Sequence, residues 1–134
     1  METKLVDMFT QIALADAKYA APGKYLRYGT AGFRDDASKL DRAFFRVGLV
    51  VALRAKLVGT MGIMITASHN PAKDNGVKII EPNGHMLTPE WEPISEKIVN
   101  SESLQNDVKE QLFGSFSKEI KDYLKPLLLK SMIA

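Results

Sequence analysis

The sequence predicts an α/β layer architecture, because helical patterns alternate with short apolar runs that are typical of buried strands. Helical spacing of apolar residues occurs at about residues 3–20, 42–57 and 88–100. Between these segments lie two apolar runs of strand length, at 61–66 and 77–80. With 134 residues, the chain is long enough for one domain with its own core.

The N-terminal part predicts a helix, a strand, a loop and a second helix, in that order. Residues 3–20 form an amphipathic pattern that ends at a proline–glycine pair. A short strand is expected at Tyr25–Tyr28, followed by a glycine-bearing loop at Gly29–Arg34. The next helix, at about 42–57, begins close to Asp41 and is apolar on most sides. We therefore expect it to be covered on more than one face.

The middle of the chain predicts two strands, a turn and a helix. Met61–Thr66 is a continuous apolar run, which favours a buried strand, and Val77–Ile80 favours a second strand. Pro82-Asn83-Gly84 is a turn signal. Thr88 is placed as an N-cap before Pro89, so a helix is expected from there to about residue 100.

The C-terminal part predicts a loop and a last helix. Ser101–Asp107 is polar, and Lys109–Leu124 is amphipathic and ends or bends at Pro126. We predict a single domain over residues 1–134, with a motif-bearing region at about 25–100 and a helical tail at 101–134 to which we assign no role.

Composition excludes several classes of protein. The net charge is +2 without a run of Lys or Arg, so no nucleic-acid partner is expected. The chain has no Cys, which excludes disulfides and thiolate metal sites. The longest apolar run, Val47–Leu53, is too short to span a bilayer, and Asp7 and Asp16 interrupt the first apolar stretch where a signal peptide would lie. We predict a soluble cytoplasmic protein without a membrane partner.

The segment from Ile65 to Lys78 carries the most chemical information. A strand end leads into a loop with Ser68 beside His69, and an Asn75-Gly76 turn returns the chain to a strand that carries Lys78. Serine is a weak nucleophile that needs a base or strong local electrostatics. A hydroxyl, an imidazole and an ammonium close together in sequence are what a phosphoryl-carrying serine requires.

Three motifs resemble those of the α-D-phosphohexomutases, in the order in which that family has them. Thr66–Pro71 matches the family's phosphoserine motif, Gly29–Arg34 resembles its arginine loop, and Asn75–Lys78 resembles its lysine-bearing turn. The flanking residues resemble the phosphoacetylglucosamine mutase branch of the family: Tyr28, Glu81–Leu87 and Trp91-Glu92. The resemblance covers about residues 25–100. It implies domain I of the family fold, a layered α/β/α domain with a small mixed sheet.

The resemblance implies an intramolecular phosphotransferase in which Ser68 carries the phosphoryl group. The serine would pass this group to a hexosamine phosphate, form a 1,6-bisphosphate, and so interconvert N-acetylglucosamine 6-phosphate and 1-phosphate. Such a transfer depends on positioning and charge stabilisation. A phosphoryl oxygen on Ser68 would also be this chain's ligand to Mg²⁺, a cation that prefers oxygen.

The resemblance also implies roles for the neighbouring residues. Arg34 would reach the phosphate with its planar fork of donors, and Lys78 would stabilise charge or move a proton. His69 would assist proton transfer or orient the loop. The expected contacts to substrate or phosphate come from five further residues: Gly29, Thr30, Gly32, Asn70 and Asn75.

Structural explanations exist for the same residues. Ser68 could be a turn former and His69 a solvated loop residue. A third functional class, an esterase, would pair Ser68 with His69. Adjacent loop residues seldom form a nucleophile–base pair, however, and the sequence offers no third member.

The charged residues also have structural explanations. Lys78 could simply face solvent from a strand. Arg34 could pair only with Asp35 or Asp36, and these adjacent carboxylates are more typical of a solvated loop or helix start than of a metal site. Trp91 is more typical of core packing than of a sugar platform.

The sequence departs from the family in what it lacks. We find no Asp-x-Asp-x-Asp metal loop and no counterparts of the loops that belong to the family's later domains. We therefore expect the chain alone to be inactive, with the remaining metal ligands absent from it. The alternative is a catalytically inactive truncated domain that binds a phosphosugar or interacts with a mutase. Its exposed interdomain surface would favour association with the missing mutase domains or self-association.

Overall fold

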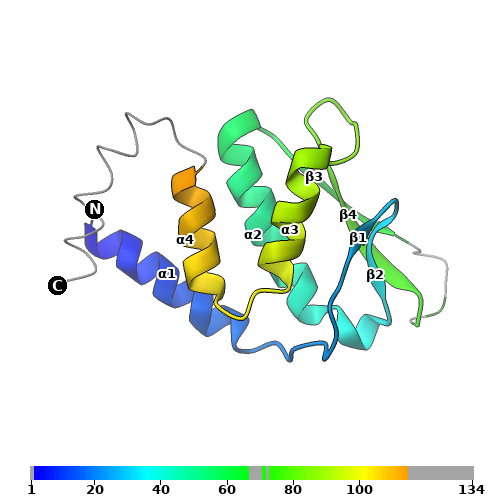
Figure 1. The fold of residues 1–134 in the computed structure, drawn as a ribbon, viewed down its shortest axis with the longest axis horizontal. Coiled ribbons are helices and arrows are strands. Elements are labelled where there is room, and N and C mark those ends of the chain that lie inside the picture. Colours follow the sequence, from blue (N-terminus) through cyan, green and yellow to red (C-terminus); the bar gives the residue numbers. More distant parts are fainter. Residues whose placement is uncertain (1, 67–70, 72, 115–134) are drawn as a thin grey trace. The chain divides into compact units, whose positions relative to one another are not determined.

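The computed structural model describes residues 2–66, 71 and 73–114. The chain divides into two compact units, which Figure 1 shows and which are described separately below. One unit is Tyr19–Glu102, and the other combines the described parts of Met1–Lys18 and Ser103–Ala134. The prediction of a single domain stays a prediction.

The smaller unit is a pair of helices, α1 (Glu2–Asp16) and α4 (Leu104–Gly114), which contact each other. Gln105 Nε2 donates to the Phe9 carbonyl at 3.0 Å, and the Lys109 ammonium lies 5.0 Å from the centre of the Phe9 ring. The first helix is confirmed, although it ends at Asp16.

The loop predicted at residues 101–107 is wrong from Leu104 onward, because α4 begins there. Leu104, Val108 and Leu112 are spaced four residues apart and are all buried, so an apolar stripe outweighs the polar composition of this segment. The part of the predicted helix at 109–124 that follows Gly114 lies outside the described residues.

The larger unit contains a four-stranded sheet with the order β1-β2-β4-β3. The strands are β1 (Tyr28–Gly29), β2 (Gly32–Asp35), β3 (Gly62–Thr66) and β4 (Asn75–Ile80). The helices of this unit are α2 (Asp41–Val58) and α3 (Glu92–Val99), with the short 3₁₀ turns η1 (Ala37–Lys39) and η2 (Pro89–Trp91). Both α-helices lie on the same side of the sheet (Figure 1).

The α/β class is confirmed, but the expected mixture of strand directions is wrong for the described strands, which all pair antiparallel. Residues 67–74 join β3 to β4, and a connection this short permits a hairpin, whereas parallel strands need a crossover of a dozen or more residues. The β2–α2–β3 segment is such a crossover. It leaves β2 and β3 pointing the same way, but β4 lies between them and runs antiparallel to both.

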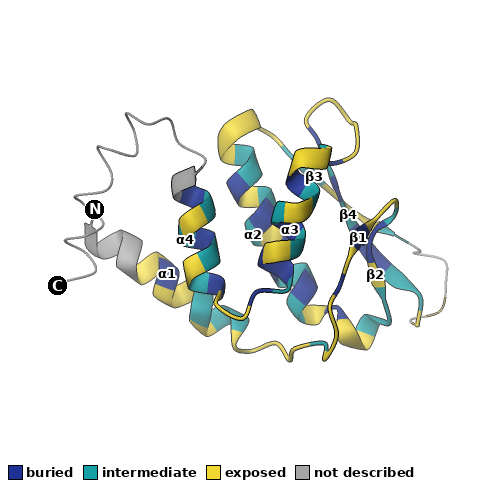
Figure 2. Cartoon of the chain, in the orientation of Figure 1, coloured by how far each residue is buried: buried dark blue, intermediate teal, exposed yellow. Residues whose placement is uncertain are grey.

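The core lies between the sheet and its two helices, as the buried residues of Figure 2 show. Phe33, Val77 and Ile79 face inward from the sheet and are at most 1% exposed. The helices and their flanks contribute further buried side chains: Leu40, Val47, Val50, Leu53, Trp91, Ile98 and Val99. Trp91 is thus a core residue, as predicted.

The first turn of the helix after residue 88 differs from the prediction. Pro89 takes the first position, but the turn is 3₁₀, and no side chain caps its N–H groups. The Thr88 hydroxyl instead donates to the Glu90 carboxylate. The Thr88 oxygen accepts from no N–H of this turn, so Thr88 does not act as the expected side-chain cap. None of the helices in the described ranges combines the length and hydropathy that a bilayer crossing requires.

Strand β3 is exposed, which contradicts its prediction as a buried strand. Ile63, Met64 and Ile65 are 49%, 50% and 53% exposed. The strand is the last of the sheet on its side, so among the described residues only β4 pairs with it. An apolar run is buried only if neighbours cover it, and an uncharged edge strand of this kind favours pairing with another chain.

We expect Met64→Lys to reduce self-association of the chain, because a lysine on an edge strand opposes pairing with a second strand. Light scattering over a concentration series measures the effect. Met86→Lys is the matched control, since Met86 is 41% exposed but lies outside β3. A wild-type chain that is monomeric throughout, or an equal effect of both substitutions, would contradict the prediction.

Candidate active site

The candidate site is built around the ends of β3 and β4, between which the serine-bearing segment runs. Thr66 is the last residue of β3, and Asn75 is the first residue of β4. Ser68, His69 and Asn70 lie outside the described residues, so their predicted roles stay predictions. The described part of the site consists of the residues around them.

Strand register places the two predicted cations on one face of the sheet. Gly76 is opposite Arg34 on β2 and opposite Thr66 on β3. Lys78 follows Gly76 by two residues and therefore shares its face, because side chains alternate along a strand. The neighbouring positions, including Val77, belong to the opposite, buried face. The structure thus brings Arg34 and Lys78 to the face of the sheet away from α2 and α3.

The predicted strand at 25–28 and loop at 29–34 are a tight hairpin, because Gly29 pairs with Gly32 across only two residues. Gly32 has φ 77°, and a Cβ there would lie 2.7 Å from Lys78 Cβ and closer still to the Val77 carbonyl. The glycine therefore allows the hairpin to approach β4 beside Lys78. Phosphate contacts by Gly29, Thr30 and Gly32 stay predictions.

Gly76 is the point where three strands meet most closely. A Cβ at this position would lie 2.7 Å from the Phe33 carbonyl and 3.0 Å from Arg34 Cδ, and closer still to Thr66 Oγ1. The Thr66 hydroxyl donates to the Ala31 carbonyl at 3.4 Å, which links the end of β3 to the turn of the hairpin. A side chain at residue 76 would displace both the arginine and the threonine.

Arg34 forms an ion pair with Asp74, through Nη2 and Oδ1. Both side chains are partly exposed, at 36% and 45%. The alternative that Arg34 pairs only with Asp35 or Asp36 is wrong. Sequence reasoning missed Asp74, because the pairing of β2 with β4 that brings it near Arg34 is not specified by local sequence.

Asp35 and Asp36 have structural roles. The Lys24 ammonium lies 2.7 Å from Asp35 Oδ2, and this partner holds the pKa of Asp35 below its ordinary value of 3.8. Asp36 caps η1 by accepting from the backbone N–H of Ser38 at 2.9 Å, which also lowers the pKa of Asp36. Among the described residues, no group of three or more His, Asp or Glu side chains could hold a metal ion.

Asn75 makes a local contact, because its Oδ1 accepts from the N–H of Gly76 at 2.8 Å. This bond shapes the start of β4 after the serine-bearing segment. Its predicted contact with substrate stays a prediction. Lys78 is half-buried on β4, and both its predicted role and the alternative of a strand residue that faces solvent stay predictions.

Polar side chains of α3 and of Asn100, the residue that follows it, hold the hairpin in place. Asn100 accepts from the N–H of Leu26 at 2.7 Å and donates to its carbonyl at 2.7 Å. Glu96 accepts from the N–H of Tyr28 at 2.9 Å. The Tyr28 hydroxyl accepts from the Ile79 N–H at 2.9 Å, and burial raises the pKa of this phenol. These bonds fix β1 to both α3 and β4.

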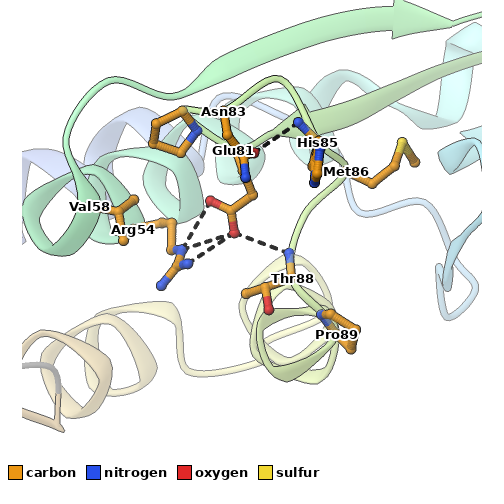
Figure 3. A pocket seen from close by; sticks show the side chains of 9 residues that line it. Arg54, Val58, Glu81, Asn83, His85, Met86, Thr88 and Pro89 are labelled. Atoms are coloured by element: carbon orange, nitrogen blue, oxygen red, sulfur yellow. Dashed lines mark hydrogen bonds and ion pairs between the residues drawn. The ribbon is translucent and has the colours of Figure 1, made fainter.

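A pocket of about 520 Å³ lies at the other end of β4, where the chain turns after Ile80 (Figure 3). Arg54 Nε and Nη2 donate to the Glu81 carboxylate at 3.0–3.3 Å, and the Thr88 N–H donates to Glu81 Oε1 at 3.1 Å. Arg54 also lies 5.5 Å from the centre of the Trp91 ring. His85, one of the residues that line the pocket, is exposed.

We expect Gly76→Ala to lower the free energy of unfolding by roughly 1–3 kcal/mol, because the new methyl group would clash with atoms of the two neighbouring strands. Urea unfolding, followed by the fluorescence of Trp91, measures the change. Gly48→Ala is the control, since a Cβ at this position in α2 meets nothing within 4 Å and should stabilise the helix by about 0.5–1 kcal/mol. Equal effects of the two substitutions would contradict the prediction.

We expect Lys24→Met to weaken the pH dependence of stability in acid. The pKa of Asp35 is lowered in the folded state, so its contribution is present above the unfolded value of 3.8 and is lost as pH falls through the folded pKa. The substitution should therefore cost stability well above pH 3.8 and little well below it. Unfolding measured at both extremes tests this, and an equal loss at both would refute it.

Comparison with known proteins identifies the family. The sequence pattern described as phosphoglucomutase/phosphomannomutase, alpha/beta/alpha domain I, matches residues 40–106. Phosphoacetylglucosamine mutase of Mus musculus is 46% identical over 79% of this chain and 20% of its own length. Phosphoacetylglucosamine mutase 1 of Schizosaccharomyces pombe is 52% identical over 77% of this chain and 18% of its own length. The chain thus spans about a fifth of these relatives.

Solved structures show the same relationship. A serine-to-alanine variant of N-acetylphosphoglucosamine mutase from Aspergillus fumigatus, in complex with glucose 1,6-bisphosphate, has a TM-score of 0.74 and 35% identity. The match covers 93% of this chain and 27% of that one. The same fungal enzyme in complex with GlcNAc-6P and magnesium has a TM-score of 0.68 and 34% identity, over 93% and 26% of the two chains. The chain therefore belongs to the phosphoglucomutase/phosphomannomutase family and carries its α/β/α domain I.

Proposed function

We propose that this chain is the serine-bearing domain of a phosphoacetylglucosamine mutase, with Ser68 as the phosphoryl carrier. The reaction would interconvert N-acetylglucosamine 6-phosphate and 1-phosphate through a 1,6-bisphosphate. The observation that carries the proposal is the placement of Arg34 and Lys78 on one sheet face, within two residues of Gly76 in the strand register and near the ends of β3 and β4 between which the serine-bearing segment runs. The names of the relatives support the choice of sugar.

The charges on this face suit a phosphoryl group. A phosphoserine adds about −1.5 to −2 charges, which must be balanced. Arg34 and Lys78 carry two positive charges, one as a planar guanidinium and one as a compact ammonium, and Asp74 offsets one of them. In the reaction, a sugar hydroxyl would attack phosphorus and the bond to Ser68 Oγ would break. The hydroxyl proton would pass to the serine oxygen through a base, for which His69 and Lys78 are the candidates.

The remaining predicted residues would orient the ligands. Asn70 would shape the serine-bearing segment, and Gly29, Thr30, Gly32 and Asn75 would contact phosphate or sugar. Because the described residues contain no group of three potential metal ligands, we derive no step through Mg²⁺. Magnesium remains a proposed cofactor, supported by the fungal enzyme solved with it. A cytoplasmic location is likewise a proposal.

We expect labelled glucose 1,6-bisphosphate to phosphorylate Ser68 when the missing domains of a relative are supplied as a second polypeptide. Peptide mapping by mass spectrometry locates the label. Ser68→Ala should abolish labelling, and Ser103→Ala, an exposed serine elsewhere, should leave it unchanged. Arg34→Ala should slow labelling by about 10²-fold, the usual effect of removing one donor to the transition state.

The proposal fails if the folded wild-type chain is not labelled in this mixture, or if the label persists in Ser68→Ala. Circular dichroism of each variant establishes that the domain is folded. Labelling without the second polypeptide would contradict the expectation that the chain alone is inactive.

A second candidate function is an inactive module that interacts with a mutase. The exposed apolar strand β3 favours it, because its edge can pair with another strand. This module would bind a full-length mutase and would not be labelled at Ser68 in the mixture described above.

A further inference from the structure

The chain contains two arginine–carboxylate pairs whose geometries differ. Arg54 and Glu81 form a bidentate pair, with side chains only 17% and 9% exposed, and the Thr88 N–H also donates to this carboxylate. Arg34 and Asp74 meet through a single nitrogen, Nη2, and both remain partly exposed. The first pair satisfies the groups it buries, whereas the second leaves most of its guanidinium available.

The path of the Arg34 side chain explains how it reaches Asp74. The side chain leaves β2 opposite Gly76, and its Cδ lies 3.0 Å from the place where a Cβ of residue 76 would be. It therefore passes over the glycine toward the start of β4. Asp74 is fixed there by its own N–H, which donates to the Pro71 carbonyl at 2.8 Å. The backbone of Asp74 is thus held in a turn, and its carboxylate pairs with the guanidinium.

The single contact leaves donors of Arg34 for another ligand. Within the described part of the chain, Nε and Nη1 of Arg34 have no protein partner. Each of these nitrogens can donate to a phosphate oxygen, and the planar guanidinium keeps their directions fixed relative to one another. If one nitrogen of the guanidinium is held by Asp74, the direction of the remaining donors is fixed before any anion arrives. This lowers the entropy cost of binding.

We propose that Asp74 is a positioning residue, which holds Arg34 so that its remaining donors bind a phosphoryl group. The inference rests on the proposed function for the nature of the ligand. Asp74 itself does not touch the phosphoryl group. Its negative charge repels that group, so its contribution to binding comes entirely from orienting the arginine.

If Asp74 acts in this way, removing its charge should change the phosphate affinity in the direction opposite to that expected from charge alone. Removing a carboxylate beside an anion site should tighten anion binding if charge alone matters. If Asp74 orients Arg34, Asp74→Asn should weaken binding even though the net charge becomes more positive. An exposed ion pair contributes little to folding. If the pair had only a structural role, Asp74→Asn would therefore change neither the stability nor the phosphate affinity much.

The test uses the full chain with inorganic phosphate as the probe, at constant ionic strength. The NMR signal of the Arg34 Nε–H group, assigned by its loss in Arg34→Lys, reports both binding and the orientation of the side chain. Asp74→Asn is compared with Asp74→Glu, which keeps the charge. Glu90→Gln is the matched control, because it makes the same charge change at an exposed carboxylate of η2.

We expect phosphate to shift the Arg34 signal in the wild type, and Asp74→Asn to weaken binding about two- to fivefold. Asp74→Glu should restore part of the affinity, and Glu90→Gln should leave it equal or slightly tighter. Equal or tighter binding by Asp74→Asn overturns the inference, as does a wild-type signal that phosphate does not move. Labelling of Ser68, measured separately, decides the proposed function in either case.

Discussion

The close approach of three neighbouring strands at Gly76 is the constraint on which the arrangement of the site depends. The absence of a side chain there lets Thr66 approach from one side and Arg34 from the other. It also lets β4, which starts where the serine-bearing segment ends, lie directly between β2 and β3. A glycine is therefore as important to the site as its charged residues, because it sets how near those residues come to the ends of the segment.

The cations of the site are supported by polar bonds that lie away from it. Asn100, which follows α3, and Glu96 on α3 bind the backbone at Leu26 and Tyr28. The Tyr28 hydroxyl binds the backbone of β4 at Ile79. The hairpin that carries Arg34 is thereby attached to the strand that carries Lys78. The carboxylates that follow Arg34 have other partners, Lys24 for Asp35 and the Ser38 N–H for Asp36, and Arg34 pairs with Asp74. A mostly buried polar framework thus directs an exposed set of charges.

Sequence reasoning recovered the α/β class, the helix at Asp41–Val58 and strand β4, since periodicity and local signals specify them. It failed where the outcome depends on partners distant in sequence. The apolar run of β3 looks the same whether or not another strand covers it, so its exposure was not predictable. The Arg34–Asp74 pair joins residues 40 apart, and the Arg54–Glu81 pair joins residues 27 apart. Such pairs follow from strand register, which the sequence alone does not provide.

The order of strands in the sheet has a consequence for the kinetics of folding. The β3–β4 hairpin closes a short loop, which typically takes microseconds, whereas pairing β2 with β4 requires contact between residues about 40 apart. The hairpin should therefore form first, and β2 should join it later. The two strands that flank the serine-bearing segment would then pair before β2 brings Arg34 to them, and pulse-labelling hydrogen exchange can resolve that sequence of events. If β2 were protected as early as β3, the two steps would be concerted.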